Sequence, residues 1–208
     1  MSRHTLLWNL MAKRYAAQPI RDTASYEKKL AITRKYLTPE SEVFEFGCGT
    51  GSTALLHAPY VKHIDATDFS EKMIEIAKDK QKLQNVNNID FNVADIRTMS
   101  VSSAKYDVIL GLNIVHLMED KPPVLAKVHT MLKPGGYFIS STVCFVTIPG
   151  PMRLMLTVMS FLGLFPKLKP YLEDDFLRDI KQAGFEVAEQ WKPEGEFTVV
   201  FLVARKSV

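Results

Sequence analysis

Apolar side chains recur every three or four residues between Leu6 and Tyr15, which is the spacing of one face of a helix. A second helix is expected from about Ser25 to Leu37, because Thr38-Pro39 stops it. The N-terminal pattern therefore predicts two short helices ahead of the first strand.

From Val43 onward, short apolar runs alternate with helical segments. The expected strands are Val43–Phe46, Val61–Thr67, Ile89–Val93, Tyr106–Leu112, Tyr137–Thr142, Phe185–Gln190 and Phe197–Ala204. The expected helices are Ser52–His57, Ser70–Lys80, Pro122–Leu132 and Glu173–Ala183, with a turn at Lys133–Gly136. This alternation predicts a Rossmann-like, doubly wound α/β sheet of about seven strands with helices on both faces. The short link Lys192–Gly195 favours an antiparallel C-terminal strand in an otherwise mostly parallel sheet.

Length and composition limit the class of protein. A chain of 208 residues suits one well-packed domain spanning residues 1–208. The 47% of hydrophobic and 24% of charged residues are typical of a soluble globular protein. The formal net charge of +3 is too small to suggest a nucleic-acid partner, and Asn113–His116 lacks the N/D-P-P-Y/F signature of amino-group methylation in nucleic acids, so no nucleic-acid partner is expected. A disulfide framework is not expected from Cys48 and Cys144, so a reducing, cytoplasmic location fits best.

The most apolar stretch, Leu154–Phe165, lies late in the chain within the segment 152–165, and it is too short to span a bilayer. We expect the insertion 143–171 to form an apolar cover over the active site. The same stretch also suits a homodimer interface, or a patch in peripheral contact with a membrane, since Lys167 and Lys169 follow it. The N-terminal helices, within residues 1–40, are expected over the active site as well.

The strongest motif is the glycine-rich run Glu45–Gly51, placed between a predicted strand and a predicted helix. An open α/β sheet binds its ligand at that place, and glycine lets the backbone approach the ligand closely. The run departs from the dinucleotide fingerprint, because Ser52 stands where its third glycine is expected. Glu45 also fits a pyrophosphate poorly. An acid there suits S-adenosylmethionine (SAM), which carries an ammonium and a sulfonium.

Two further acids follow at the ends of the next two strands. The carboxylate of Asp68 can accept hydrogen bonds from both ribose hydroxyls, as acids do in other nucleotide-binding α/β folds. Asp95 can accept one from the adenine amino group. Ordinary roles compete with both, because Asp68 can cap the helix near Ser70 and Asp95 can be a simple loop residue.

Five motifs in order carry a family resemblance: EFGCGTG at 45–51, IDATDFS at 64–70, NVADI at 92–96, YDVILGLNIVHL at 106–117 and LKPGGYF at 132–138. From about Val43 to Ala204 the sequence resembles the class I SAM-dependent methyltransferases, in particular the small-molecule branch that includes ubiquinone and menaquinone biosynthesis enzymes. The resemblance implies SAM as cofactor, S-adenosylhomocysteine as product and a small, apolar or quinone-like methyl acceptor.

The resemblance also implies a role for each matching residue. The methionine half of SAM would be lined by Gly47, Cys48, Gly49 and Gly51, with Glu45 at its ammonium. The adenosine half would be held by Asp68, Phe69, Met73, Ala94, Asp95 and Ile96. Leu112 and Asn113 would face the sulfonium and the acceptor.

Residues that would act on the acceptor are less strongly indicated. His116 follows the fourth strand, where a histidine can take a proton from a substrate, although packing or hydrogen bonding is an equally simple role. Tyr15, Tyr26 and Tyr171 are candidates for lining the acceptor pocket. No spacing of histidines, cysteines and acids suggests a metal site.

Three functions remain open at this point. The first is an active methyltransferase for a small molecule. The second is an NAD(P)-dependent oxidoreductase, which Glu45 and Ser52 disfavour. The third is a SAM-binding protein without catalytic activity, which an intact glycine loop does not exclude.

Overall fold

The computed structural model describes residues 3–20, 22–144, 170–194 and 198–207, together with Met155, Thr157, Val158, Ser160 and Phe161. Within this part of the chain, seven strands form one sheet in the order β3-β2-β1-β4-β5-β7-β6. The strands are β1 (Glu42–Phe46), β2 (His63–Asp68), β3 (Ile89–Val93), β4 (Tyr106–Leu112), β5 (Leu132–Cys144), β6 (Phe185–Trp191) and β7 (Thr198–Lys206).

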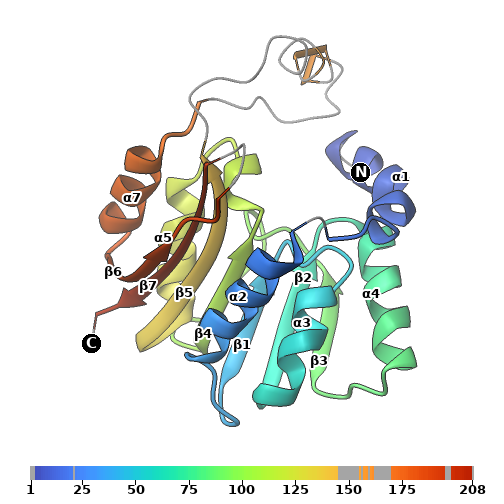
Figure 1. The fold of residues 1–208 in the computed structure, drawn as a ribbon, viewed down its shortest axis with the longest axis horizontal. Helices are drawn as coiled ribbons and strands as arrows, with labels where there is room; N and C mark the ends of the chain where they lie inside the picture. Colours follow the sequence, from blue (N-terminus) through green and yellow to red (C-terminus); the bar gives the residue numbers. More distant parts are fainter. Residues whose placement is uncertain are drawn as a thin grey trace.

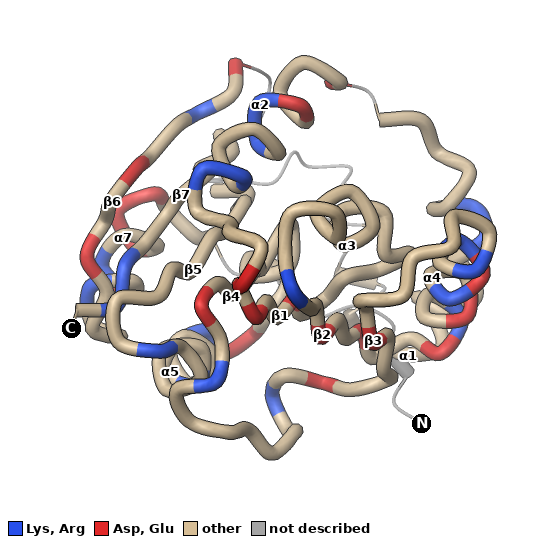
Figure 2. Tube along the Cα trace, turned by 90° about the horizontal axis from the view of Figure 1, so that it is seen from below, with Lys and Arg blue, Asp and Glu red and all other residues tan. Residues whose placement is uncertain are grey.

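Helices connect the strands and cover both faces of the sheet (Figure 1). The helices are α1 (Arg3–Ala16), α2 (Thr23–Arg34), α3 (Ser52–His57), α4 (Glu71–Leu83), α5 (Pro122–Met131) and α7 (Glu173–Gln182), with short 3-10 turns at Ala58–Tyr60 and Val115–Leu117. The two helices expected ahead of the first strand are therefore present. Seen along the sheet, α2 and α3 lie on one side and α5 on the other (Figure 2).

The pairing of the strands confirms the expected topology. The neighbours from β3 through β5 pair in parallel, whereas β7 is antiparallel to both β5 and β6. The expected turn at Lys133–Gly136 is instead an irregularity inside β5. The register along β4 moves from Tyr106 opposite Leu132 to Val108 opposite Tyr137. Gly135, with φ of 77°, allows this bend.

Two apolar clusters hold the layers together. On one face, buried side chains of α5 and α7, including Leu125 and Phe176, pack on Phe44 and Phe138 of the sheet. On the other face, α3 and α4 pack on the sheet around Ile64. Burial of this kind fixes the strands firmly, so the loops at their carboxyl ends are held in place by the core.

Helix α1 is attached to the start of α4. The Ser70 hydroxyl accepts a hydrogen bond from the Met73 N–H at 3.2 Å, which is the expected helix cap, and donates to the Asn9 side-chain oxygen at 2.6 Å. One serine therefore both begins α4 and places α1 beside the carboxyl ends of the strands.

Most of the proposed apolar cover, residues 143–171, lies outside the described residues. Of its side chains that are described, Met155, Val158 and Phe161 are exposed. The cover therefore stays a prediction, with a dimer interface and a membrane patch as its alternatives. In the described part of the chain, no helix combines the length and the apolar character that crossing a membrane requires.

Candidate active site

A cavity lies at the carboxyl ends of β1, β2 and β4, where an open α/β sheet binds ligands. Ten of the thirteen residues expected at the cofactor line it. They are Gly47, Gly49, Asp68, Phe69, Met73, Ala94, Asp95, Ile96, Leu112 and Asn113. The other three, Glu45, Cys48 and Gly51, do not line it. We refer to this space as the loop cavity.

The glycine loop needs its glycines for different reasons. Gly47, Gly49 and Gly51 all have left-handed φ values, of 64°, 54° and 72°. A Cβ on Gly49 would meet only Tyr15 Cε1, at 3.8 Å, so the loop leaves open space there. A Cβ on Gly51 would lie 2.6 Å from Phe91 Cζ and 2.8 Å from Ala77 Cβ. Gly51 is therefore required by packing, not by contact with a ligand in the cavity.

Cys48 also has a structural position. Its side chain is buried in the cluster beneath the loop, and its N–H donates to Thr67 O at 3.0 Å, which ties the loop to β2. Burial raises the pKa of the thiol, as do the nearby carboxyls of Glu45 and Asp68. Cys48 and Cys144 are both free and buried, consistent with the absence of a disulfide framework.

Asp68 organises the loop from the end of β2. Its carboxylate accepts hydrogen bonds from the Gly49 N–H at 3.0 Å and from the Ser70 N–H at 2.8 Å. Burial raises the pKa of Asp68, and these two backbone hydrogen bonds oppose that rise. Each carboxylate oxygen can accept more than one hydrogen bond, so Asp68 can hold the loop and still receive donors from a ligand.

Glu45 lies below the loop as a buried acid. Its side chain is 3% exposed, and Oε2 has no hydrogen-bond partner among the described residues. Burial raises the pKa of Glu45 to about 8, with a further contribution from the charge of Asp68. A cation that approaches the loop would stabilise the ionised form of this carboxyl.

Asp95 has a partner that the sequence analysis missed. Arg97 also lines the cavity, and its Nε lies 2.9 Å and 3.0 Å from the two carboxylate oxygens of Asp95. Burial alone would raise the pKa of Asp95, but the hydrogen bonds from Arg97 outweigh it and lower the pKa. The carboxylate is thus kept ionised and oriented. The only sequence signal for this pair is the spacing of two residues.

Helix α1 contributes two aromatic rings to the loop cavity. Tyr15, expected in the acceptor pocket, lies here beside Gly49, and Trp8 contacts it edge to face at 6.3 Å between ring centroids. Nothing in the sequence indicated that Trp8 lines the cavity, because an aromatic residue on a short amphipathic helix is usually a core residue.

Asn113 marks the boundary with a second cavity. Its φ is 56°, a left-handed conformation that asparagine tolerates, and its N–H donates to Ser141 O at 2.7 Å. Leu112 and Asn113 line both spaces. The second space, which we call the α2 cavity, is lined by Ile20, Asp22, Ser25, Tyr26, Lys29, Leu30, Thr33, Thr53, His57, Leu112, Asn113, Ser141, Pro193, Glu194 and Val199.

Of the other tyrosines expected in the acceptor pocket, one lines the α2 cavity and one is buried in the core. Tyr26 lines the α2 cavity, with its hydroxyl 3.2 Å from Thr53 Oγ1. Tyr171 does not reach either cavity, because it is buried beside Phe176 and its hydroxyl donates to Asp179 at 2.9 Å. Its placement in an acceptor pocket is therefore not supported by the described residues.

His116 lines neither cavity, although its neighbours Ile114 and Leu117 line the loop cavity. Its Nδ1 accepts a long hydrogen bond from the Val143 N–H, at 3.4 Å. Burial and, to a smaller extent, the positive charge of Lys121 lower the pKa of His116 to about 4. The imidazole is neutral at neutral pH but only weakly basic, which is unfavourable for a general base.

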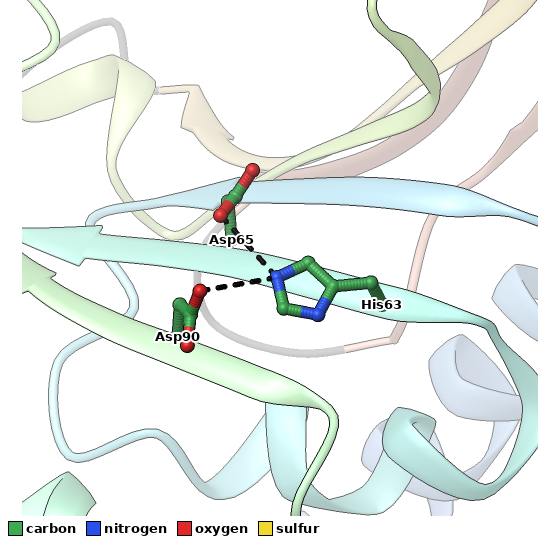
Figure 3. A group of neighbouring side chains, drawn as sticks. All are labelled: His63, Asp65 and Asp90. Carbon is green, nitrogen blue, oxygen red and sulfur yellow. Dashed lines mark ion pairs between the residues drawn. The ribbon is translucent and has the colours of Figure 1, made fainter.

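A separate polar group lies on β2 and β3 (Figure 3). His63 Nε2 is 3.4 Å from Asp65 Oδ1 and 3.5 Å from Asp90 Oδ2, and the three side chains are close enough together to hold a metal ion. Asp65 already accepts hydrogen bonds from Lys105 at 2.6 Å and Tyr106 at 2.7 Å. The group has no signal in the sequence, because only the register of the strands brings Asp90 beside Asp65. None of the three residues lines the loop or α2 cavity.

Comparison with known proteins identifies a methyltransferase domain in this chain. Residues 43–136 match the family model of a methyltransferase domain. The chain is 33% identical over 144 residues to malonyl-[acyl-carrier protein] O-methyltransferase of Bacillus anthracis. The aligned residues cover 64% of this chain and 52% of that protein. It is 28% identical over 104 residues to ubiquinone biosynthesis O-methyltransferase of Coxiella burnetii, covering 49% of this chain and 43% of that protein.

Solved structures share the fold. A putative methyltransferase from Bacillus halodurans superimposes with a TM-score of 0.72 at 15% identity, covering 89% of this chain and all (100%) of that one. Geranyl diphosphate C-methyltransferase from Streptomyces coelicolor gives 0.71 at 11% identity, covering 87% and 79%. The family match identifies residues 43–136 as a methyltransferase domain, and the superpositions show that the chain shares the Rossmann-like fold of these methyltransferase structures.

The matches fix the family more firmly than the reaction. The chain spans about half the length of the two curated relatives named above. A [4+2]-cyclase superimposes as well, with a TM-score of 0.73 at 16% identity, covering 88% of this chain and 81% of that one. A shared fold at such low identity does not determine the chemistry, which must be argued from the site.

Proposed function

We propose that this chain binds SAM in the loop cavity and transfers its methyl group to a small molecule in the α2 cavity, within a single domain over residues 1–208. The observation that carries the proposal is the pair of adjoining cavities that share Leu112 and Asn113. One is rimmed by the glycine loop and two acids, and the other is open to a second ligand. Methyl transfer needs two ligands held side by side.

The residues of the loop cavity fit SAM. Gly49 leaves room for close approach, and the buried carboxyl of Glu45 beneath the loop favours a cationic ligand end. Asp68 would accept the ribose hydroxyls, while Asp95, oriented by Arg97, would accept the adenine amino group. Phe69, Met73 and Ile96 would enclose the adenosine, as expected from the family motifs.

The chemistry requires positioning above all. When bound, SAM would supply an activated methyl group, and its transfer to the acceptor would leave S-adenosylhomocysteine. The chain would orient both partners and exclude water, which can supply about 7–11 kcal/mol. Trp8 and Tyr15 on α1 contribute to that enclosure. Leu112 and Asn113 would lie between donor and acceptor.

The acceptor is proposed to be a small molecule with an apolar body. Ile20, Leu30 and Val199 provide apolar walls to the α2 cavity. The named relatives act on varied acceptors, so the quinone-like character expected from the sequence remains only one possibility within this class.

A calorimetric comparison of SAM with NAD tests the cofactor, and a panel of acceptors scored by S-adenosylhomocysteine formation tests turnover. SAM binding without turnover on any acceptor would favour the non-catalytic alternative. Binding of NAD in preference to SAM would favour the oxidoreductase.

Glu45 should release a proton when SAM binds. The pKa of Glu45 is raised to about 8 without ligand, so most of the carboxyl is protonated at pH 7. The SAM ammonium would favour the ionised form, and the proton would leave. Calorimetry in two buffers of different ionisation enthalpy should reveal this release for the wild type and its loss in Glu45→Gln.

The same shift has a consequence for stability. Because the folded-state pKa lies above the usual carboxyl value of 4.5, the folded state holds more protons, and stability falls as pH rises from about 4.5 to 8. Glu45→Gln should reduce that fall, as measured by thermal unfolding at several pH values.

For the calorimetric experiment, equal proton release by wild type and Glu45→Gln on SAM binding would show that Glu45 does not contact the SAM ammonium.

His116→Ala should lower the turnover rate by less than about tenfold, whereas loss of a general base costs roughly 10²–10⁴. The reason is the low pKa of His116, about 4, which makes the imidazole a poor proton acceptor at neutral pH. Single-turnover rates at saturating SAM would measure this. A fall of a hundredfold or more, with SAM affinity unchanged, would restore His116 as the base.

A further inference from the structure

One amino group lies in the α2 cavity without an acidic partner. Lys29 of α2 is half-buried, and its Nζ donates to the Ser141 hydroxyl oxygen at 3.0 Å. Among the described residues, no carboxylate oxygen lies within the 4.0 Å of an ion pair with Lys29. A lysine in this position has donors left for a ligand.

The amino group is also connected to the boundary between the two cavities. Ser141, which receives the hydrogen bond from Lys29, has its Oγ 3.2 Å from Asn113 Oδ1. Asn113 lines both cavities. Lys29 is therefore two hydrogen bonds away from the residue that would separate methyl donor and acceptor.

Two acids line the same cavity but lie at its exposed edge. Asp22 is exposed, and its side chain accepts the Ser25 N–H at 2.9 Å as the cap of α2. Glu194 is exposed as well. Water screens both charges more strongly than it screens the half-buried Lys29, so the inner part of the cavity favours an anion.

A second, independent observation points to a polar ligand here. His57 lines the cavity at the end of α3, is 0% exposed, and neither ring nitrogen has a hydrogen-bond partner among the described residues. Burial lowers the pKa of His57 to about 4, so the ring is neutral and presents one donor and one acceptor. A buried polar group of this kind is costly unless an ordered water or a ligand satisfies it, so a polar ligand that reaches the ring would be favoured.

We propose that the methyl acceptor carries a carboxylate, and that Lys29 binds it in the α2 cavity while Ile20, Leu30 and Val199 contact its apolar body. This inference rests on the proposed function and names the class of acceptor. A carboxylate is favoured over a phenol because it is ionised at neutral pH, whereas a phenol keeps its proton.

The electrostatics of Lys29 support this assignment. Burial lowers the pKa of its amino group, while the charge of Asp22 works in the opposite direction. An anion bound beside Nζ would restore the ammonium to its usual pKa, so ion pairing and protonation reinforce each other. Charge-assisted hydrogen bonds of this type are about twice as strong as neutral ones.

Paired probes can test the charge preference without knowledge of the natural acceptor. Binding of 4-fluorobenzoate and its neutral counterpart 4-fluorobenzamide would be measured by fluorine NMR, with S-adenosylhomocysteine at saturation. We expect the acid to bind wild type about tenfold more tightly than the amide. Lys29→Met should abolish that preference, and Lys29→Arg should retain most of it.

Lys28→Met is the matched control, because Lys28 is a neighbouring lysine on α2 that does not line the cavity and instead lies 4.2 Å from the ring centroid of Trp191. It should keep the preference for the acid. Equal binding of the two probes to wild type, or no binding of either at millimolar concentration, would overturn the inference. So would a preference that survives in Lys29→Met.

Calorimetry with S-adenosylhomocysteine on the same samples separates the two levels of the argument. If it binds but the acid shows no preference, only the carboxylate assignment fails. If it does not bind to folded protein, the proposed function fails. A Lys29→Met variant that binds S-adenosylhomocysteine like wild type is folded, so its result with the probes can be interpreted.

Discussion

Asp68→Ala should weaken SAM binding by roughly 10- to 150-fold, because a charge-assisted hydrogen bond to the ribose is worth about 1.5–3 kcal/mol. The structure adds a second reason for a large effect. The Asp68 carboxylate also accepts the N–H groups of Gly49 and Ser70, so its loss releases the glycine loop from β2. Calorimetric titration with SAM would measure the change.

Asp90→Ala is a suitable control for that variant, since Asp90 is exposed on the neighbouring strand and does not line the loop cavity. It should leave SAM affinity within about twofold of wild type. Thermal unfolding would confirm that both variants fold. If Asp68→Ala bound SAM as tightly as Asp90→Ala does, Asp68 would have only the structural role of holding the loop.

Gly51→Ala should destabilise the fold strongly. A left-handed φ of 72° costs an alanine about 1–2 kcal/mol, and its Cβ would lie 2.6 Å from Phe91 Cζ. Overpacking of this kind costs a further 1–3 kcal/mol or so. The melting temperature should fall by the order of 10 °C.

Gly49→Ala is the informative comparison, because it bears the same backbone penalty without the clash. Its Cβ would have open space, with Tyr15 Cε1 at 3.8 Å. We expect a smaller loss of melting temperature than in Gly51→Ala, together with a loss of SAM affinity greater than about tenfold because the methyl group would occupy ligand space. If Gly49→Ala bound SAM normally, the loop cavity would not be the cofactor site.

Much of the fold could be predicted because its signals are local. The strand Tyr106–Leu112 and the helix Ser52–His57 have the bounds expected from their patterns. Ser70 caps α4 as expected, through the Met73 N–H. Apolar periodicity and capping residues act over a few positions, so they are legible in one sequence.

The site was less predictable where it depends on contacts between residues far apart in the sequence. Gly51 belongs to a motif expected to touch the cofactor, yet the neighbours that require glycine there are Phe91 on β3 and Ala77 on α4. Lys29 and Ser141 are far apart in sequence but joined by one hydrogen bond. Only the packed sheet brings such residues together, which is why Lys29, His57 and Ser141 had no sequence signal as lining residues of the α2 cavity.

Basic and acidic residues are interspersed along α4 (Figure 2), which gives that helix no positive stripe of the kind that follows a nucleic-acid backbone. A small-molecule acceptor for this domain stays our proposal.

The central claim is that the loop cavity binds SAM, and calorimetry with SAM and NAD on wild type and Asp68→Ala tests it most directly. The account predicts micromolar binding of SAM to wild type, a marked loss in Asp68→Ala and no binding of NAD to either protein. Binding of NAD by the wild type, or failure of the folded wild type to bind SAM, would contradict it.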